Sequence, residues 1–575
     1  MTMQRLEAKR VNGHTYYYLS QWGWRDGKCR RLSQQYLGKL EDFSPRLTGA
    51  GPTPAYAESF DWGRPLALWQ AAQRAELIPL ADQICPKRQQ GLSAGTYLAL
   101  AAINRAVHPV SKRQLWDWLV KTVLVRVVPG VSEEALRSQR FWDSFEAWET
   151  DTLHTLWKGL LQRAVQRENI DLSRLCYDGT NFYTFIDTFN VQNHLARRGK
   201  NKQGRTNLRQ VSYALVCAAR GQWPLYYEVY EGNRNDSRQF GEMLGRFAAF
   251  YEGLAPAGTP PPKTTLVFDK GNNSAANFAL IDTLGLDYVG AVKLGEVAEW
   301  AHASNEQDAR WQACPGLEGT KAFRVQALVY GRVRTLVVSW HEGLFQAQWA
   351  TVQSELARAL AKLESLRQGL ERRHRGEVKG GQAPTVNSVQ KQCDEILHRE
   401  HLNEVVVIEV GTEAQGIPTL QYHVAAGALE RLADTRLGKN ILVTSQSAWS
   451  DAQVIEAYRS QFLIEEMFQQ MKDRDLGCWW PMFHWTDRKI QVHGLYCTVA
   501  LLLRAMVGRQ VREAGIDLPL AGLWAQLERV REIVNVYEPG QGRKESVHQA
   551  VPSRLTGIQE RLVEVLRLRG ESRSV

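Results

Sequence analysis

The order of elements in residues 174–293 constrains the fold of this chain more than any other feature. Three strand-like segments are separated by short loops that contain glycine, and the second and third are close enough to form a hairpin. Helical and strand-like segments then alternate. The order β-β-β-α-β-α-β predicts a mixed α/β layer. The predicted strands are Arg174–Phe185, Arg209–Ala219, Trp223–Tyr230, Thr265–Phe268 and Tyr288–Lys293, and the predicted helices are Asp236–Glu252 and Ser274–Leu284.

Two acidic residues lie in this layer at positions that favour a ligand. Asp178 lies inside the first strand, where a charge is costly unless it faces solvent, a partner or a metal ion. Asp269 ends the apolar run Leu266–Phe268, and ligands of open α/β sheets bind where strands end. A turn former or a helix cap is the alternative for each acid alone. Together they are candidate ligands of a cation.

The stretch Tyr458–Lys472 predicts one amphipathic helix. At roughly 100° per residue, four polar residues fall within about 60° of one another, beside an apolar stripe. Glu466 points about 100° away from Glu465, so Glu465 is the acid aligned with the polar strip. The alternative is that these polar residues are the solvent-exposed border of an ordinary amphipathic helix. The four residues are Tyr458, Gln461, Glu465 and Lys472.

The composition suits a soluble protein that works against polyanions. With 575 residues the chain is long enough for several domains, and 44% hydrophobic residues exclude global disorder. Lys and Arg outnumber Asp and Glu by 71 to 61, a net charge of +10, although many metabolic enzymes share such a balance. The eight cysteines contain no C-x-x-C pair, which argues against a zinc ribbon or a disulfide framework. With no leader and no long apolar run, we expect a cytoplasmic protein without a membrane anchor.

Asp178, Asp269 and Glu465 together suggest metal-dependent chemistry. Hard oxygen ligands select Mg²⁺, for which Mn²⁺ can substitute. Two such ions roughly 3.5–4 Å apart activate a water or a 3′-hydroxyl and stabilise the leaving oxygen in phosphodiester displacement. Paired carboxylates also serve glycosidases, but that function leaves the basic charge and Lys472 unexplained.

The rest of the chain divides into further regions. Residues 61–168 carry apolar residues at helical spacing, and Gln346–Arg373 predicts one long helix. The expected regions are a small basic β domain (1–60), a helical, DNA-binding region (61–168), the first part of the α/β core (169–294), an insertion with β hairpins and the long helix (295–445), the second part of the core with the Glu465 helix (446–510) and a helical C-terminal region (511–575).

Two of these regions carry open alternatives. In the N-terminal unit, strands at His14–Leu19 and Arg30–Leu37 flank a turn at Asp26-Gly27, and the basic hairpin serves either as a docking flap or as a DNA contact. In the helical region, Ser111 is expected to cap a helix over Lys112–Val120. With the helix before it, that helix either forms a helix-turn-helix motif that reads DNA or only packs within the protein.

Several further residues have two possible roles. Four tryptophans in or beside the insertion either pack its core or stack on an unpaired base. A basic loop between the first two strands is either solvated or in contact with DNA. His493 is structural unless geometry brings it to the acids. The tryptophans are Trp300, Trp311, Trp340 and Trp349, and the loop residues are Lys200, Lys202, Arg205 and Arg209.

These motifs resemble those of DDE transposases of bacterial insertion sequences, in the branch whose last acid lies in a Y-x2-R-x3-E-x6-K signature. The resemblance covers most of the chain. It rests on Tyr458, Gln461 (in place of the arginine), Glu465 and Lys472, on Asp178 in Y-D-G-T-N-F-Y, on Asp269 in F-D-K-G, on the G-N-x-x-D run Gly232–Asp236, on Leu37-Gly38-Lys39-Leu40 and on the turn His108–Lys112.

The resemblance implies an RNase H-like catalytic core interrupted by a β-rich insertion before the last acid. It implies that Asp178, Asp269 and Glu465 hold the metal ions, and that Tyr458 and Lys472 contact phosphates near the cut end. An amide at position 461 can still hydrogen-bond a phosphate oxygen but brings no charge, and Arg459 lies about 160° away on the helix. Residues expected to contact DNA are Tyr458, Gln461, Lys472, Lys270, Arg209, Lys112 and Arg113.

The implied function is that of a transposase that binds the terminal inverted repeats of its element in double-stranded DNA. It would cleave the ends and join them to target DNA, and the need to pair two ends implies a homodimer. Two alternatives remain open: a nuclease with the same core that performs no strand transfer, and a DNA-binding derivative without catalytic activity.

Overall fold

The computed structural model describes the chain as two compact units. Unit 1 comprises Met1–Leu68, Trp116–Glu133 and Gln510–Val575, and unit 2 comprises Trp69–Leu115 and Glu134–Arg509. The predicted turn Asp26-Gly27 and the loop residues Lys200 and Lys202 lie outside the described residues. Those are residues 2–25, 28–39, 53–86, 91–146, 148–199, 204–205, 207–254, 263–378, 380–412, 416–474, 477–538 and 546–569.

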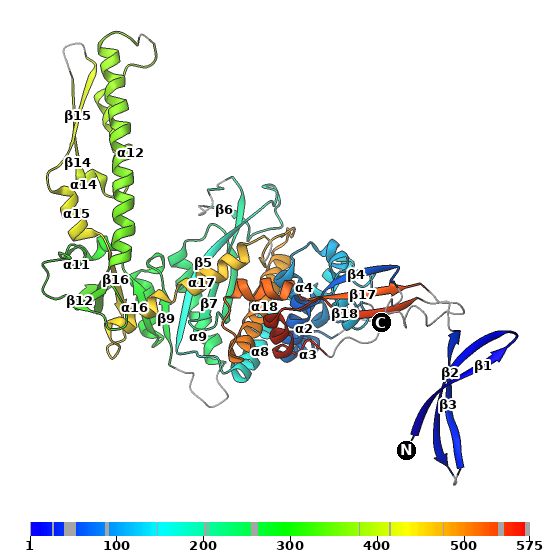
Figure 1. Cartoon of the computed structure of the whole chain (residues 1–575). Coiled ribbons are helices and arrows are strands. Elements are labelled where there is room, and N and C mark those ends of the chain that lie inside the picture. The colour runs from blue at the N-terminus through cyan, green and yellow to red at the C-terminus, as the bar shows by residue number, and fades with distance from the viewer. Residues whose placement is uncertain are drawn as a thin grey trace. The chain divides into compact units, whose positions relative to one another are not determined.

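A ten-stranded mixed sheet forms the centre of unit 2 (Figure 1). The five predicted strands of the α/β layer are confirmed within it. In spatial order the strands are β11 (Gln312–Ala313), β12 (Thr320–Val329), β13 (Arg332–His341), β16 (Lys439–Thr444), β10 (Asp287–Ala291), β9 (Thr265–Phe268), β5 (Arg174–Thr184), β7 (Arg209–Ala218) and β6 (Arg197–Arg198), with β8 (Pro224–Glu231) also paired to β7. Strands β5, β9 and β10 are parallel, whereas β7 is antiparallel to both β5 and β8.

Two helices between the strands cover one face of the central sheet. The ring of Phe240 lies 4.7 Å from that of Tyr177 on β5, and the ring of Phe278 lies 5.8 Å from that of Phe268 on β9. Both contacts bury aromatic side chains completely or nearly so, which stabilises the helices on this face. The helices are α9 (Asp236–Glu252) and α10 (Ala275–Thr283), as the sequence predicts.

Strand β16 joins the β12–β13 hairpin to the central sheet. It pairs antiparallel with β10 on one side and with β13 on the other. The sequence predicts the hairpin Ala322–Trp340 as part of a separate insertion, whereas the backbone forms one continuous sheet. Without β13, the edge of β16 would present unpaired N–H and C=O groups.

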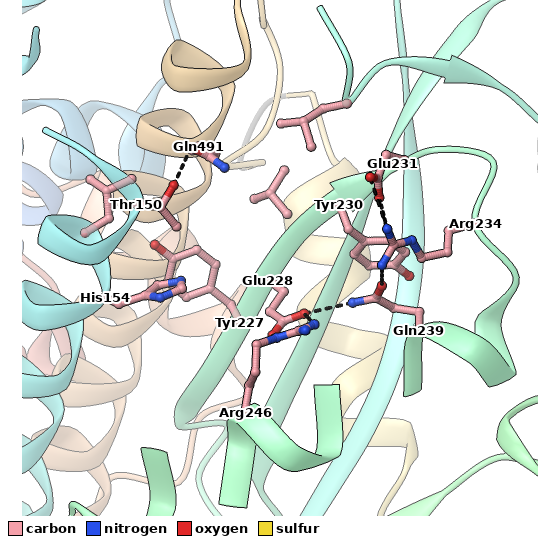
Figure 2. A pocket seen from close by; sticks show the side chains of 13 residues that line it. Thr150, His154, Tyr227, Glu228, Tyr230, Glu231, Arg234, Gln239, Arg246 and Gln491 are labelled. Carbon is pink, nitrogen blue, oxygen red and sulfur yellow. Dashed lines mark hydrogen bonds and ion pairs between the residues drawn. The ribbon is translucent and has the colours of Figure 1, made fainter. Parts of the chain in front are cut away.

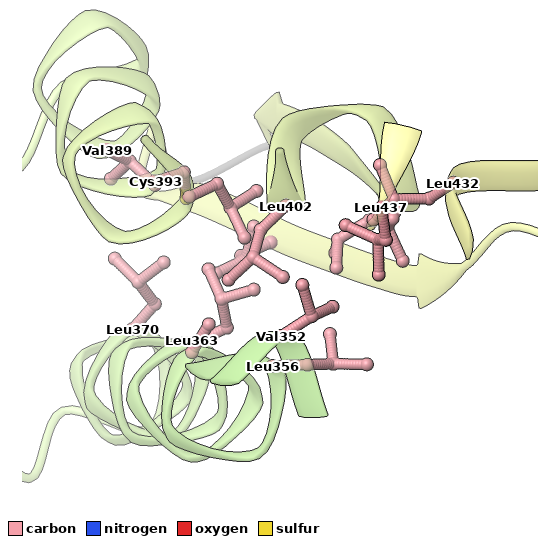
Figure 3. Packing of buried hydrophobic residues seen from close by; sticks show 14 residues of the cluster. Val352, Leu356, Leu363, Leu370, Val389, Cys393, Leu402, Leu432 and Leu437 are labelled. Carbon is pink, nitrogen blue, oxygen red and sulfur yellow. The ribbon is translucent and has the colours of Figure 1, made fainter. Parts of the chain in front are cut away.

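The segment between β13 and β16 has a hydrophobic core of its own (Figure 3). Its centre is formed by fully buried apolar residues such as Val352, Leu363 and Val389. Most of this segment is helical, and its two strands form a single two-stranded sheet. The elements are α12 (Glu342–His374), α13 (Val386–Leu397), α14 (Leu402–Val405), β14 (Val406–Thr412), β15 (Pro418–Val424) and α15 (Ala428–Arg436). The predicted long helix and strand pair are thereby confirmed.

The tryptophans near this segment make packing contacts. Trp349 packs against the hydrophobic core. The indole N–H of Trp311 donates to the carbonyl of Ser304 at 2.8 Å, and its ring packs edge-on against Phe323. These contacts favour the packing role over base stacking for both residues.

Unit 1 contains two three-stranded antiparallel sheets, and one of them joins distant parts of the sequence. The sequence predicts a helical C-terminal region (511–575), and the structure corrects this in part: two helices are present, but two strands of the region pair with each other and with residues 56–61. The first sheet is β1 (Thr2–Val11), β2 (His14–Arg25) and β3 (Lys28–Lys39); the second is β4 (Tyr56–Asp61), β17 (Arg531–Tyr537) and β18 (Val547–Pro552), accompanied by α19 (Leu520–Glu528) and α20 (Gly557–Val565).

The predicted helical region between residues 61 and 168 is helical, but its candidate DNA-reading segment differs from the prediction. Lys112–Gln114 forms a single 3₁₀ turn before a five-residue helix, and the Ser111 hydroxyl donates to the Gln114 side chain instead of capping the helix. The helices of this region are α2 (Gly63–Arg74), α3 (Leu77–Ile84), α4 (Ala94–Val107), α5 (Leu115–Leu119), α6 (Leu124–Val127), α7 (Ser138–Phe145) and α8 (Thr150–Glu168).

Lys112 is buried, which argues against its predicted contact with DNA. Its side chain is 5% exposed, and its ammonium lies 4.4 Å from the ring centroid of Tyr496 and 5.0 Å from that of Phe141. Burial holds the pKa of Lys112 well below its usual value. Arg113, by contrast, is exposed, and its contact with DNA stays a prediction.

Helix α18 (Asp487–Glu513) is the one described helix that is long and apolar enough to cross a membrane. Since 94% of its apolar window is buried inside the protein, it has the surroundings of a core helix. His493 on this helix is fully buried, with one ring nitrogen 2.7 Å from the Trp479 carbonyl. The structural role of His493 is therefore favoured.

The buried Asp61 makes the stability of unit 1 depend on pH. Burial raises its pKa to about 6, although the nearby Arg64 opposes that shift. Because the folded pKa exceeds the unfolded one, the ionised carboxylate destabilises the fold above pH 6, and protonation relieves this cost as the pH falls. We expect Asp61→Asn to raise the free energy of unfolding at pH 7.5 by about 1–3 kcal/mol.

The measurement is urea denaturation of the wild-type chain and Asp61→Asn at pH 7.5 and pH 5. The difference between the two proteins should shrink at pH 5, where the wild-type carboxylate is largely protonated. A difference that is the same at both pH values would contradict this account of Asp61.

Candidate active site

The first two candidate acids lie next to each other on neighbouring parallel strands. Strands β5 and β9 pair as far as Tyr177 and Phe268, and Asp178 and Asp269 are the next residue of each segment. Neighbouring strands are about 4.8 Å apart. Successive residues point to opposite faces, so both acids lie on the face opposite α9 and α10. Asp178 accepts a hydrogen bond from the Gly179 N–H at 2.7 Å.

The third acid comes from a helix that is interrupted. The predicted single helix Tyr458–Lys472 is wrong, because Ser460 and Gln461 form a tight turn. The Ser460 hydroxyl donates to the Ala457 carbonyl at 2.6 Å, and the Ser460 carbonyl lies 3.6 Å from Sγ of Cys176 on β5. The angular argument for one polar strip therefore does not extend across the turn. The two helices are α16 (Asp451–Arg459) and α17 (Phe462–Lys472).

Tyr458 connects the three candidate acids. Its hydroxyl donates a hydrogen bond to Oδ1 of Asp269 at 3.2 Å. Burial raises the pKa of Tyr458, and the negative charges of Asp269, Glu465 and Asp178 raise it further. All three carboxylates thus act on one phenol, and Tyr458 remains a protonated donor throughout the neutral pH range.

Lys472 supplies a positive charge on the same side of β5. Its ammonium donates to the Thr180 hydroxyl and lies 5.8 Å from the ring centroid of Phe182. Thr180 and Phe182 follow Asp178 at intervals of two residues, so all three share one face of the strand. The contact with Thr180 was not foreseen, although the same alternation in the sequence identifies Thr180 as a neighbour of the site.

Gln461 stands where the Y-x2-R-x3-E-x6-K signature has an arginine, and the nearby Arg459 does not take the place of that arginine in this structure. The amide nitrogen of Gln461 is buried and makes no hydrogen bond within the described residues. The guanidinium of Arg459 donates to the Thr320 hydroxyl, at the start of β12. Contact of Gln461 with DNA stays a prediction.

Two other predicted DNA contacts differ in exposure. Lys270 is exposed immediately after Asp269. Arg209 is half-buried, and its guanidinium donates to the carbonyls of Thr188 and Asn190. These bonds order the loop after β5.

The three acids have the donor chemistry that a hard divalent cation requires. All three candidate side chains are carboxylates, and Glu465 is exposed in the first turn of α17. Within the described residues, however, no three His, Cys, Asp or Glu side chains converge closely enough to hold a metal ion. The three acids therefore do not form a closed set of metal ligands in this structure.

A separate polar cavity of about 270 Å³ lies against β8 (Figure 2). Its central carboxylate, Glu228, accepts hydrogen bonds from Arg246, from Gln239 and from the Tyr226 hydroxyl. His154 faces the cavity from α8, and burial lowers its pKa. The Glu228 carboxylate oxygens are paired within the protein, and none of the three candidate acids lines the cavity. The hydrogen-bond network around this cavity is therefore structural, and the cavity is not the predicted site.

The bond from Tyr458 to Asp269 gives a testable prediction. For the metal-dependent DNA cleavage that the motifs predict, we expect Tyr458→Phe to lower the rate about 10- to 100-fold, since partners that orient a metal ligand contribute on this scale. Fluorescence-detected cleavage of a DNA duplex with Mg²⁺ measures this rate. Cleavage at an unchanged rate would show that the hydroxyl has no role in orienting Asp269.

Comparison with protein families agrees with the motifs. A family model described as the transposase DDE domain matches residues 171–503, more than half of the chain. The matched region includes β5, β9 and α17. Among solved structures, the chain is similar to a piggyBac transposase in a synaptic complex with hairpin DNA, with 9% identity over 83% of this chain and 82% of that chain and a TM-score of 0.35. No curated protein matches.

Proposed function

Because this chain belongs to the transposase DDE domain family, we propose that it is the transposase of a bacterial insertion sequence. It binds the terminal inverted repeats of its element in double-stranded DNA. It then cleaves the ends and joins them to target DNA. A homodimer on two paired ends, working in the cytoplasm on the nucleoid, is the corresponding assembly.

The core of this transposase is proposed to be RNase H-like. The strand order β8-β7-β5-β9-β10, with β5, β9 and β10 parallel and β7 antiparallel, supports this assignment. In that arrangement β5 is the central strand, and its Asp178 lies beside the Asp269 that follows β9. The segment between β13 and β16 is then the insertion before the last acid.

Asp178, Asp269 and Glu465 are the residues that would hold the divalent metal ions, with Mg²⁺ preferred and Mn²⁺ as a substitute. Bound metal would supply Lewis-acid activation of the attacking oxygen and stabilisation of the leaving oxygen. Tyr458 orients Asp269 through its hydrogen bond. Lys472, placed beside Thr180, provides a point charge for a phosphate of the DNA end.

The observation that carries this proposal is the position of the Tyr458 hydroxyl. It is bonded to Asp269 and lies within the electrostatic influence of Glu465 and Asp178. The charges of three acids from widely separated parts of the sequence thus raise the pKa of one phenol, which supports a shared catalytic centre.

The test is incubation of the full chain with a duplex that carries the element's own ends, in Mg²⁺ and in EDTA, together with a labelled target plasmid. A transposase releases ends with a free 3′-hydroxyl and joins them to the plasmid in Mg²⁺ alone. Cleavage without joining would identify the nuclease alternative. Binding of the ends without cleavage in either Mg²⁺ or Mn²⁺ would identify an inactive DNA-binding derivative.

A further inference from the structure

The N-terminal sheet β1–β3 concentrates positive charge that the catalytic core does not use. Residues 1–39 contain eight Lys or Arg residues and two acidic ones, a net charge of +6 within a chain whose total is +10. Most of these basic side chains are exposed. So dense a charge on so small a sheet favours a polyanionic partner.

The pairing register divides this sheet into two different faces. Residues directly opposite one another on antiparallel strands share a face. Lys9, Tyr16 and Lys39 form one row across the three strands. Glu7, Tyr18 and Tyr36 form the next row on the same face, where Glu7 is paired with Arg31 at 3.6 Å. We call this the tyrosine face.

The ammonium groups of the tyrosine face lie over aromatic rings. The Nζ atom of Lys9 lies 5.2 Å from the ring centroid of Tyr18, and that of Lys39 lies 5.9 Å from the ring centroid of Tyr16. The ring of Tyr36 packs against both tyrosines, with centroids at 6.1 Å and 5.3 Å, yet Tyr36 is 55% exposed. Cations that are already ordered lose less side-chain entropy when they bind a charged partner.

The same contacts favour phosphates over unpaired bases as the partner. Base stacking needs an open aromatic face, and a lysine lies over the rings of both Tyr16 and Tyr18. The strands of Lys9 and Lys39 flank β2, so their backbones are roughly 10 Å apart. A duplex carries one negative charge per ≈ 1.7 Å of its axis, so several phosphates fall within this span.

We propose that the tyrosine face of the β1–β3 sheet binds the phosphate backbone of duplex DNA through Lys9 and Lys39. The inference rests on the proposed transposase function and adds to it a DNA-binding surface outside the catalytic core. An acidic protein and single-stranded DNA are the competing partners that the experiment distinguishes.

The chain offers a charge-matched control on the other face. Arg10 follows Lys9 on β1 and therefore points to the opposite face of the sheet. Arg30 lies on that face too, because it pairs with Gly23, whose neighbour Trp22 belongs to the tyrosine face. Both are exposed. The double variants Lys9→Gln/Lys39→Gln and Arg10→Gln/Arg30→Gln thus remove the same charge from opposite faces of one sheet.

The measurement is the affinity of the full chain and both variants for a fluorescent 30-base-pair duplex of mixed sequence, in EDTA, across a series of KCl concentrations. Two lost phosphate contacts should reduce the slope of log Kd against log salt concentration by about 1.8. We expect Lys9→Gln/Lys39→Gln to bind about 10- to 50-fold more weakly at 100 mM KCl, and the control to bind within about threefold of the parent chain.

Equal weakening by both variants would overturn the proposal, because the charge would then act without regard to face. Unchanged binding by Lys9→Gln/Lys39→Gln would overturn it too, as would a loss confined to a single-stranded 30-mer or to a polyglutamate probe. Failure of the catalytic function is separate: a chain that binds duplex through this face without cleaving it leaves the inference intact. Circular dichroism confirms that both variants remain folded.

Discussion

Replacing Glu465 by Gln should abolish Mg²⁺-dependent cleavage of end-containing DNA while leaving DNA affinity within about threefold of the wild type. The amide keeps the size of the side chain but removes the negative charge that a hard cation requires. Substitutions that merely orient a metal ligand already cost about 10- to 100-fold in affinity or activity. Loss of a ligand itself should therefore exceed about 100-fold.

Glu466→Gln is the matched control for this experiment. Glu466 is the next residue of α17, it is also exposed, and its carboxylate accepts a hydrogen bond from Gln222 at 2.5 Å. It does not number among the charges that act on Tyr458. We expect this variant to cleave at a rate within about threefold of the wild type, in line with a small effect of an exposed surface substitution.

The assay follows single-turnover cleavage of a labelled duplex with protein in excess, and filter binding in EDTA gives the affinity. Equal cleavage by the wild type and Glu465→Gln would remove Glu465 from the catalytic centre. If Glu466→Gln alone lost activity, Glu466 would become the third acid.

The central sheet could be predicted because its strands are short apolar runs with clear boundaries. Thr265–Phe268 is buried at every position, and such a run has few alternatives to an inner strand. The register between β5 and β9 could not be predicted, because it depends on pairing between segments about ninety residues apart. That register brings Asp178 beside Asp269, so the sequence identified both acids without showing that they are neighbours.

The turn between α16 and α17 could not be predicted for a related reason. Helical periodicity continues through Ser460 and Gln461, and neither residue is a strong helix breaker. The bonds that favour the turn run from Ser460 to Ala457 and to Cys176 on β5. The second of these exists only after the helices pack on the sheet.

Two other errors had different causes. Strand β17 has the alternating burial of a half-covered strand, but its sequence does not alternate between apolar and polar residues. Glu532 is at a buried position and Ile533 is not, so the periodicity of Arg531–Tyr537 gives only a weak strand signal. The burial of Lys112 had no sequence signal, because the exposed appearance of Lys112-Arg113 hides the aromatic rings of Tyr496 and Phe141 that enclose the ammonium.

Trp479→Ala should destabilise unit 2 more than any other substitution considered for this chain. Trp479 is fully buried, and its ring stacks on Phe182 of β5 with centroids 4.1 Å apart and planes 9° apart. It also packs edge-on against Tyr213 and His493. Truncation of a buried tryptophan to alanine leaves a large cavity, and we expect a loss of about 3–5 kcal/mol in the free energy of unfolding.

Two variants show whether packing is the cause of that loss. The indole nitrogen of Trp479 is buried and makes no hydrogen bond within the described residues, so Trp479→Phe keeps an aromatic ring, sacrifices no polar contact and should cost clearly less. Trp480→Ala removes a neighbouring, half-exposed indole and should also cost less. Urea denaturation followed by tryptophan fluorescence and circular dichroism measures all three. Phe182 lies on the same strand face as Asp178 and beneath the Lys472 ammonium. We therefore expect DNA cleavage by Trp479→Ala to fall even where the variant is still folded. A fully active variant with an unchanged urea midpoint would show that the stack of Trp479 on Phe182 supports neither the fold nor the site.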